Sequence, residues 1–181
     1  AAVALGSADI RPDLAEAEGV VEANLNAPEQ TVISGPEESV ARVIERLNAA
    51  GGAAKNLPVA AAFHRPVVAA AAGRLERYLA NVALTAPRDP VWSNATAAPY
   101  PADASAIGRY LSEHVRQPVR FVDLVRGMHA SGARIFIEVG PGQVLSGLVG
   151  RTLRGQEHAV VAVDRYRDSG LRGFLTALGE L

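Results

Sequence analysis

The sequence contains no cysteine, and this absence excludes several kinds of chemistry. Without thiols the chain can form no disulfide, no thiolate metal site and no cysteine acyl-enzyme. Histidines do not replace these ligands, because the four in the sequence lie far apart and no H-E-x-x-H spacing occurs. We therefore expect no metal site. The four are His64, His114, His129 and His158.

Lysine is also nearly absent, since Lys55 is the only lysine among 18 basic residues. The net charge is -1 and no run of Lys or Arg occurs, which argues against nucleic acid or an anionic membrane surface as a partner. No apolar run is long enough to cross a bilayer, and the N-terminus lacks a charged region followed by an apolar one. These features predict a soluble, cytoplasmic chain. Its 181 residues, 49% of them hydrophobic, suffice for one domain or two small ones.

Residues 1–60 alternate between strand-like and helix-like runs. Gly and Pro separate these runs, and Ala27-Pro28-Glu29 between two strand-like runs predicts a hairpin. The predicted order, β-α-β-β-α-β, is that of a ferredoxin-like fold. The predicted elements are a strand at 2–5, a helix at 9–18 with Pro12 in its first turn, strands at 20–26 and 30–34, a helix opening at Gly35-Pro36-Glu37-Glu38, and a strand at 53–59.

Residues 61–181 continue with helices that alternate with strands, as in part of a parallel sheet. The apolar run at 134–139 is almost uninterrupted, which predicts a strand covered on both faces. The predicted helices cover 67–84, 105–115, 121–130, 144–153 and 171–181, and the predicted strands cover 91–94, 134–139 and 159–163.

His64 lies on a proline-flanked loop at the junction of these two parts. An imidazole that titrates near neutral pH can act as a general base in acyl transfer, and clefts often form at such junctions. A lone histidine in an apolar loop can also be purely structural, and the residues alone leave both interpretations open. No G-x-S-x-G motif occurs, so the sequence names no serine nucleophile.

The turn Gly140-Pro141-Gly142 precedes a predicted helix, whose N-terminus can bind an anion. The turn has neither the spacing nor the lysine of a Walker A loop, and it does not match G-x-G-x-x-G. We interpret it as a structural turn.

Five motifs, in this order, resemble the successive signatures of acyltransferase domains in polyketide synthases. The resemblance extends to the malonyl-CoA:acyl carrier protein transacylases of fatty acid synthesis and to polyunsaturated fatty acid synthases. It covers nearly all of the 181 residues, but only the latter part of the family's domain. The motifs are residues 23–35 (ANLNAPEQTVISG), 62–64 (AFH), 90–96 (PVWSNAT), 117–121 (QPVRF) and 136–145 (FIEVGPGQVL).

The resemblance implies a ferredoxin-like small subdomain at 1–60 and the C-terminal part of an α/β-hydrolase-like acyltransferase core at 61–181, ending in a helix that leads out of the domain. In the family, a serine on a GHSxG elbow attacks the malonyl thioester, an arginine holds the free carboxylate and a histidine activates the serine. The serine, the arginine and a Gln-containing oxyanion loop would all precede Ala1. His64 matches the family's histidine, which makes it the predicted catalytic base. His114 matches the position whose backbone carbonyl orients that imidazole through Nδ1.

The residues before His64 bear on the choice of acyl group. Family members that select malonyl commonly carry HAFH, whereas methylmalonyl enzymes carry YASH; here Ala61 replaces the leading histidine, and Arg65 replaces the usual serine after the motif. Phe63 is bulkier than serine and can exclude a 2-methyl group, although one methyl discriminates only modestly. The resemblance therefore favours malonyl.

Two asparagines of the first motif, Asn24 and Asn26, lie in a stretch that the family places near its thioester channel. They are candidate contacts for pantetheine. A role in capping the predicted hairpin is equally open.

The leading hypothesis is an S-acyltransferase that moves malonyl from coenzyme A, through an acyl-enzyme, to the phosphopantetheine thiol of an acyl carrier protein, with no permanently bound cofactor. The implied partners are that carrier protein, the N-terminal part of the acyltransferase domain and the neighbouring synthase domains. One alternative is a non-catalytic module whose ferredoxin-like unit docks a carrier protein or a synthase domain. Another is that the chain is a fragment of a full domain.

Overall fold

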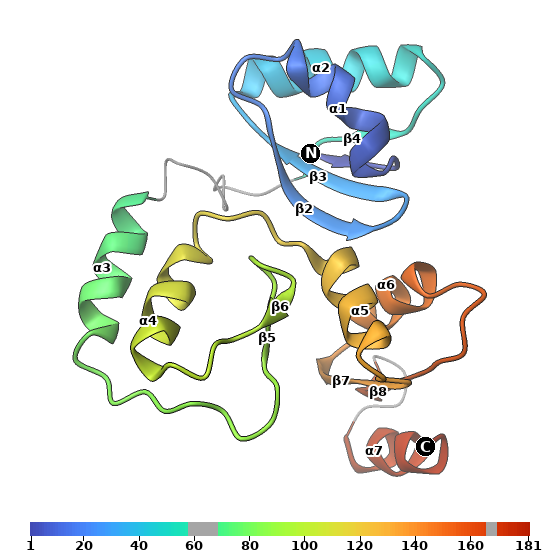
Figure 1. Ribbon diagram of the computed structural model, residues 1–181. Helices are drawn as coiled ribbons and strands as arrows, with labels where there is room; N and C mark the ends of the chain where they lie inside the picture. Colours follow the sequence, from blue (N-terminus) through green and yellow to red (C-terminus); the bar gives the residue numbers. More distant parts are fainter. Residues whose placement is uncertain (58–68, 166–169) are drawn as a thin grey trace. The chain divides into compact units, whose positions relative to one another are not determined.

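The computed structural model describes residues 1–57, 69–165 and 170–181. Helices and strands alternate along the chain (Figure 1). The chain divides into two compact units, Ala1–Leu124 and Val125–Leu181, which are described in turn. Together they form a mixed α/β protein.

The first unit opens with a four-stranded antiparallel sheet in the spatial order β2-β3-β1-β4. One helix follows β1 and another follows β3, so the order β-α-β-β-α-β predicted from the sequence is confirmed. The last strand is much shorter than predicted, and residues 58 and 59 of the predicted strand lie outside the described residues. The elements are β1 (Ala2–Val3), α1 (Ser7–Ala15), β2 (Val21–Ala27), β3 (Gln30–Ser34), α2 (Glu37–Ala49) and β4 (Ala54–Lys55).

Both helices pack on the same face of this sheet, as Figure 1 shows. The sequence causes this because α2 carries apolar residues at helical spacing and the strands contribute inward-facing valine and isoleucine. Burying each such side chain contributes about 1.5–3 kcal/mol. The shared core consists of Val3, Ile10, Val20, Ile33, Val40, Val43 and Leu47.

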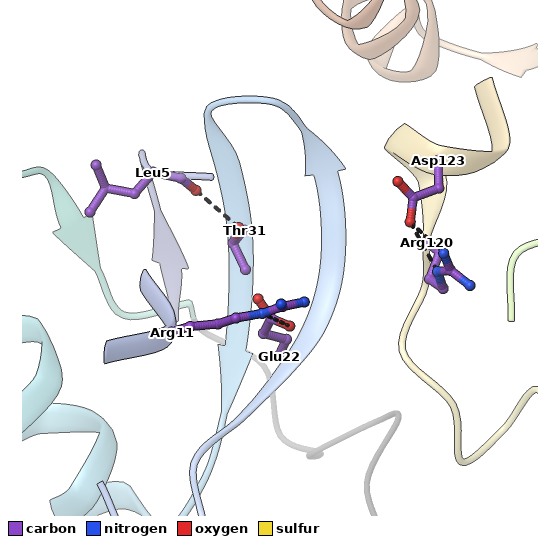
Figure 2. A network of polar contacts seen from close by, with 6 residues as sticks. All are labelled: Leu5, Arg11, Glu22, Thr31, Arg120 and Asp123. Carbon is purple, nitrogen blue, oxygen red and sulfur yellow. Dashed lines mark hydrogen bonds and ion pairs between the residues drawn. The ribbon is translucent and has the colours of Figure 1, made fainter. Parts of the chain in front are cut away.

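Helix α1 begins two residues earlier than predicted, and this changes the place of its proline. The Gly6 carbonyl accepts hydrogen bonds from the amides of Asp9 and Ile10, both at 3.2 Å, and so starts the helix at Ser7. Pro12 consequently lies inside the helix rather than in its first turn, where the prediction placed it. A polar contact also ties β3 to the residues between β1 and α1: the buried Thr31 hydroxyl donates to the Leu5 carbonyl at 2.9 Å (Figure 2).

The rest of the first unit contains two helices and a short hairpin. They are α3 (Ala69–Leu79), β5 (Trp92–Ser93), β6 (Ala98–Pro99) and α4 (Ala104–Glu113). Helix α3 ends five residues before the predicted end at 84, and the Asn81 side-chain amide donates to the Arg77 carbonyl at 2.9 Å in its last turn. Strand β6 was not predicted.

Helix α5 (Phe121–Ala130) has the predicted bounds and crosses from the first unit into the second. The second unit then forms a β-α-β crossover: β7 (Ile135–Pro141) and β8 (Ala159–Asp164) are parallel, and α6 (Val144–Thr152) connects them. The predicted parallel pairing of these strands is confirmed. Helix α7 (Gly170–Gly179) packs against β8.

The prediction that β7 is covered on both faces is wrong for the residues described. Its side chains alternate between half-buried and exposed, with exposed fractions of 54% for Ile135, 48% for Ile137 and 83% for Val139. The reason is that β8 is the only strand paired with β7 in the described chain, and α6 is the helix that packs on it. One face of β7 is therefore exposed among the described residues, although its sequence is almost continuously apolar.

No described helix has the length and apolarity that a membrane span requires. Within 1–57, 69–165 and 170–181 there is also no group of three His, Asp or Glu side chains that could hold a metal ion.

Candidate functional site

The structure describes three of the six residues predicted for the site. Asn24 and Asn26 lie on β2, and His114 directly follows α4. Ala61, Phe63 and His64 fall within 58–68, outside the described residues. The arrangement of the six as a group therefore stays a prediction.

His114 is half-buried and forms the C-cap of α4. Its amide donates to the Tyr110 carbonyl at 3.1 Å, which continues the helical pattern, and the amide of Gln117 folds back to the Glu113 carbonyl at 3.2 Å. Carbonyl groups at this end of a helix have no partner within the helix, so they accept hydrogen bonds from groups outside it. His114 thus lies at the C-terminal end of α4, where the helical hydrogen-bond pattern ends.

The other end of α4 is held by a side-chain cap. The Asp103 carboxylate accepts a hydrogen bond from the Ser105 amide at 2.9 Å and from the Ser105 hydroxyl at 2.8 Å. These two hydrogen bonds lower the pKa of Asp103 below its ordinary value. The helix that carries His114 therefore has a defined start as well as a defined end.

The chain after His114 lies against β2, next to Asn24. The Leu25 amide donates to the Val119 carbonyl, and the Val119 amide donates to the Ala23 carbonyl, both at 2.8 Å. These two bonds form an isolated parallel bridge between Asn24 and Val119. Pro118 disfavours a helical conformation at Gln117, the residue before it, which fits the end of the helix ahead of this bridge. No local pattern in the sequence indicates that β2 is the partner of Val119.

Arg120 connects the same stretch to the hairpin between β5 and β6. Its amide donates to the Asn94 carbonyl at 2.8 Å, and its Nη1 donates to the Thr96 carbonyl at 3.3 Å. Its Nε and Nη2 donate to Asp123 Oδ2 at 3.0 and 2.8 Å (Figure 2). Parts of three motifs, at 23–35, 90–96 and 117–121, are therefore in direct contact.

The turn of that hairpin, residues 93–97, is named the Asn94 turn below. The Ala97 amide donates to the Ser93 carbonyl at 2.8 Å, and Ala97 takes the left-handed conformation with φ 54°. Asn94 Oδ1 is buried and has no hydrogen-bond partner in the part of the chain that is described. Sequence reasoning missed both Asn94 and Arg120 as functional candidates, although both lie in quoted motifs.

The side chains of Asn24 and Asn26 make no hydrogen bond to any other described residue. They do not hold the turn between β2 and β3, so among these residues the hairpin-capping role has no contact to support it.

The turn Gly140-Pro141-Gly142 serves the protein's own packing. The Glu138 carboxylate accepts hydrogen bonds at the start of α6 from the Leu145 amide at 3.2 Å and from the Ser146 amide and hydroxyl, both at 2.7 Å. Burial raises the pKa of Glu138, but the hydrogen bonds from Ser146 and from the helix amides outweigh it, so its pKa lies below the ordinary value. The Glu138 carboxylate thus occupies the N-terminus of α6, where an anionic ligand would otherwise bind. This supports the interpretation of Gly140-Pro141-Gly142 as a structural turn.

A groove of about 440 Å³ runs between α3 and α4 in the first unit. None of the three described candidates, Asn24, Asn26 and His114, lines it. Its lining residues are Glu76, Leu79, Ala80, Val82, Ala83, Leu84, Ala104, Ser105, Gly108 and Arg109.

Comparison with known proteins gives a family match along the whole chain. The model of the acyl transferase domain family matches residues 1–181. A type I polyketide synthase of phenolphthiocerol synthesis, Pks15/1 from Mycobacterium marinum, is 34% identical over 181 residues, which are 99% of this chain and 8% of the relative. The chain is thus a small part of the length of the curated relatives it matches.

Two solved structures have the same fold, and each matches nearly the whole of this chain. The acyltransferase domain from the second module of the salinomycin polyketide synthase has a TM-score of 0.88 and 33% identity, over 99% of this chain and 42% of that one. The malonyl CoA-acyl carrier protein transacylase from Clostridium perfringens has a TM-score of 0.88 and 30% identity, over 99% of this chain and 55% of that one. The chain therefore spans about half the length of these solved acyltransferases. From the family match and these likenesses it follows that the chain belongs to the acyl transferase domain family.

Proposed function

We propose that this chain is part of an enzyme that transfers a malonyl-type unit from coenzyme A to the phosphopantetheine thiol of an acyl carrier protein. The observation that carries the proposal is the direct contact among three family motifs around Val119 and Arg120, next to His114. The likeness to a solved malonyl CoA-acyl carrier protein transacylase supports the substrate class.

In the proposed reaction His64 is the general base and His114 a positioning residue. A serine, which the family resemblance places outside these 181 residues, loses its proton to the His64 imidazole and attacks the malonyl thioester carbon. The serine O–C bond forms, the C–S bond breaks, and the imidazolium returns the proton to the coenzyme A thiolate. The same steps in reverse, with the carrier-protein thiol as nucleophile, release the malonyl group from the serine. The His114 carbonyl accepts a hydrogen bond from Nδ1 and so keeps Nε2 directed at the serine.

We also propose that the domain boundary lies near residue 60, between a ferredoxin-like subdomain and an α/β-hydrolase-like core. The β2-β3-β1-β4 order of the antiparallel sheet, with both helices on one face, supports the first part. The parallel β7-α6-β8 crossover supports the second.

We assign the choice of malonyl to Phe63 and Ala61. We assign contact with the pantetheine arm to Asn24 and Asn26. A phenylalanine beside the base narrows the space for a 2-methyl group. The side chains of Asn24 and Asn26 have no partner among the described residues, so they can hydrogen-bond the amides of a pantetheine arm.

The proposed partners are an acyl carrier protein, the N-terminal part of the acyltransferase domain and neighbouring synthase domains. The name of the mycobacterial relative, a polyketide synthase, supports a synthase setting. We place the protein in the cytoplasm, and we propose no permanently bound cofactor and no nucleic-acid or membrane partner.

Intact-mass spectrometry of the full-length protein after mixing with malonyl-CoA tests the proposal. We expect one malonyl adduct, and a slower adduct with methylmalonyl-CoA. The 181 residues alone should form none, since they contain no G-x-S-x-G serine. A full-length protein that binds acyl carrier protein but never gains a malonyl group would instead be a docking module.

A further inference from the structure

The stretch from His114 to Arg120, named the connecting segment, is fixed at both ends. At its start, the amides of His114 and Gln117 hydrogen-bond to the last turn of α4. Near its end, Val119 is bonded on both sides to β2. Pro118 lies between these anchors and has a restricted φ, so little backbone freedom remains between them.

Arg120 adds an anchor that depends on its side chain. Its guanidinium group reaches the Thr96 carbonyl on the Asn94 turn. The same group also reaches the Asp123 carboxylate in the first turn of α5 (Figure 2). A planar guanidinium can serve two acceptors in different directions, whereas a lysine ammonium is a single compact charge on a flexible stem. The side chain therefore joins the connecting segment, the Asn94 turn and α5.

We propose that Arg120 is a positioning residue that sets the place of the His114 backbone carbonyl. Without the guanidinium, the Asn94 turn and the start of α5 lose their shared anchor. The backbone bonds of Val119 to β2 and of the Arg120 amide to the Asn94 carbonyl stay in place. What is lost are the side-chain contacts with the Thr96 carbonyl and the Asp123 carboxylate, which set how closely the segment lies against the Asn94 turn and α5, so a small shift of the segment follows. The displacement reaches His114 through a short, restricted piece of backbone. The inference rests on the proposed function, in which that carbonyl orients the catalytic imidazole.

Arg116 offers a matched control within the same segment. Its guanidinium forms an ion pair with Glu113, three residues earlier at the end of the same helix. No contact of its side chain with β2 or the Asn94 turn is found among the described residues. Removing Arg116 thus changes the charge by the same amount as removing Arg120, but leaves the outer anchor in place.

The test compares Arg120→Ala, Arg120→Lys and Arg116→Ala in the full-length protein. Single-turnover acylation is measured at several malonyl-CoA concentrations, so that the maximal rate and the half-saturating concentration are separated. A displaced catalytic group costs roughly 10- to 100-fold in rate, so we expect a loss in this range for Arg120→Ala with half-saturation changed less than about 2-fold. Arg120→Lys should recover part of the rate, and Arg116→Ala should match the wild type.

Thermal unfolding of each variant separates a catalytic effect from a folding defect. If Arg120→Ala acylates at the wild-type maximal rate, whatever its melting temperature, Arg120 is only structural and the inference is wrong. If Arg120→Ala does not fold, a wild-type rate for Arg120→Lys overturns the inference in the same way. Absence of acylation in the wild-type protein would overturn the proposed function itself, and the inference with it.

Discussion

Glu138 is the residue whose ionisation the structure ties most directly to stability. Its carboxylate accepts hydrogen bonds at the N-terminus of α6, and its pKa is lower in the folded protein than the ordinary value of 4.5. A lowered pKa means that the folded state prefers the charged form. The stabilisation is therefore fully present above the unfolded-state pKa and is lost as the pH falls through the folded-state pKa.

We predict that Glu138→Gln destabilises the protein at neutral pH by about 1 kcal/mol, as expected for a lost helix cap. Glu157→Gln is the matched control, because Glu157 is exposed and its side chain has no hydrogen bond or ion pair among the described residues. Urea unfolding of both variants at pH 7 and again in acid should show the difference shrinking as the pH falls. Equal stability of the two variants at pH 7 would show that the Glu138 cap contributes nothing.

Some residues of the candidate site could be predicted from the sequence, and others could not. His64, His114 and the two asparagines of β2 were identified because they match motif positions. Arg120 and Asn94 were not, because their contacts run through the backbone carbonyls of Asn94 and Thr96. Side-chain type carries no information about which carbonyl a folded chain presents.

Among the elements, the packing of α2 against Val20, the residue before β2, depends on a glycine. A Cβ atom at Gly35 would lie 2.7 Å from Val20 Cγ2 and 3.0 Å from Val40 Cγ2, closer than side chains pack. In α3, by contrast, the nearest atom to a Cβ at Gly73 would be 3.9 Å away. The two glycines thus differ in the space around them.

We expect Gly35→Ala to destabilise the protein by about 1–3 kcal/mol through overpacking. Gly73→Ala should stabilise α3 by about 0.5–1 kcal/mol, because alanine loses less backbone entropy than glycine in a helix. Denaturant unfolding monitored by circular dichroism measures both. A neutral or stabilising effect of Gly35→Ala would refute the role of Gly35 in close packing.

Elements were predictable where the pattern is local. The hairpin of β2 and β3 and the bounds of α5 follow from periodicity and from the turn residues between the runs. The bridge between Asn24 and Val119 joins residues far apart in sequence, and periodicity does not encode such a pairing. The exposure of β7 escaped prediction for a related reason, since an apolar run shows that a strand can be covered but not by what.

On the scale of the whole molecule, the second unit exposes several large apolar side chains, and groups of such side chains often mark association sites. The exposed side chains come from one face of β7 and from α7. Exposed apolar faces and unpaired strand edges favour association with another chain. The residues are Ile135, Ile137, Val139, Leu171, Phe174, Leu175 and Leu178.

We therefore predict that the 181-residue chain alone self-associates or binds a partner chain in solution. Val139→Lys, at the most exposed of the β7 positions, should reduce the association measured by light scattering. Val91→Lys is the control, because Val91 is exposed in the first unit, away from β7 and α7 in the sequence. A monodisperse monomer for the unmodified chain would contradict the prediction.

The central claim is that His64 is the base of an acyl transfer and that His114 acts through its backbone carbonyl. Its most direct test is single-turnover acylation of the full-length protein by malonyl-CoA, with His64→Ala and His114→Gln compared at matched thermal stability. Loss of a positioned base predicts a roughly 10²- to 10⁴-fold lower rate for His64→Ala. His114→Gln keeps the carbonyl and should lose little. Near wild-type acylation by His64→Ala, or equal losses in the two variants, would contradict the account.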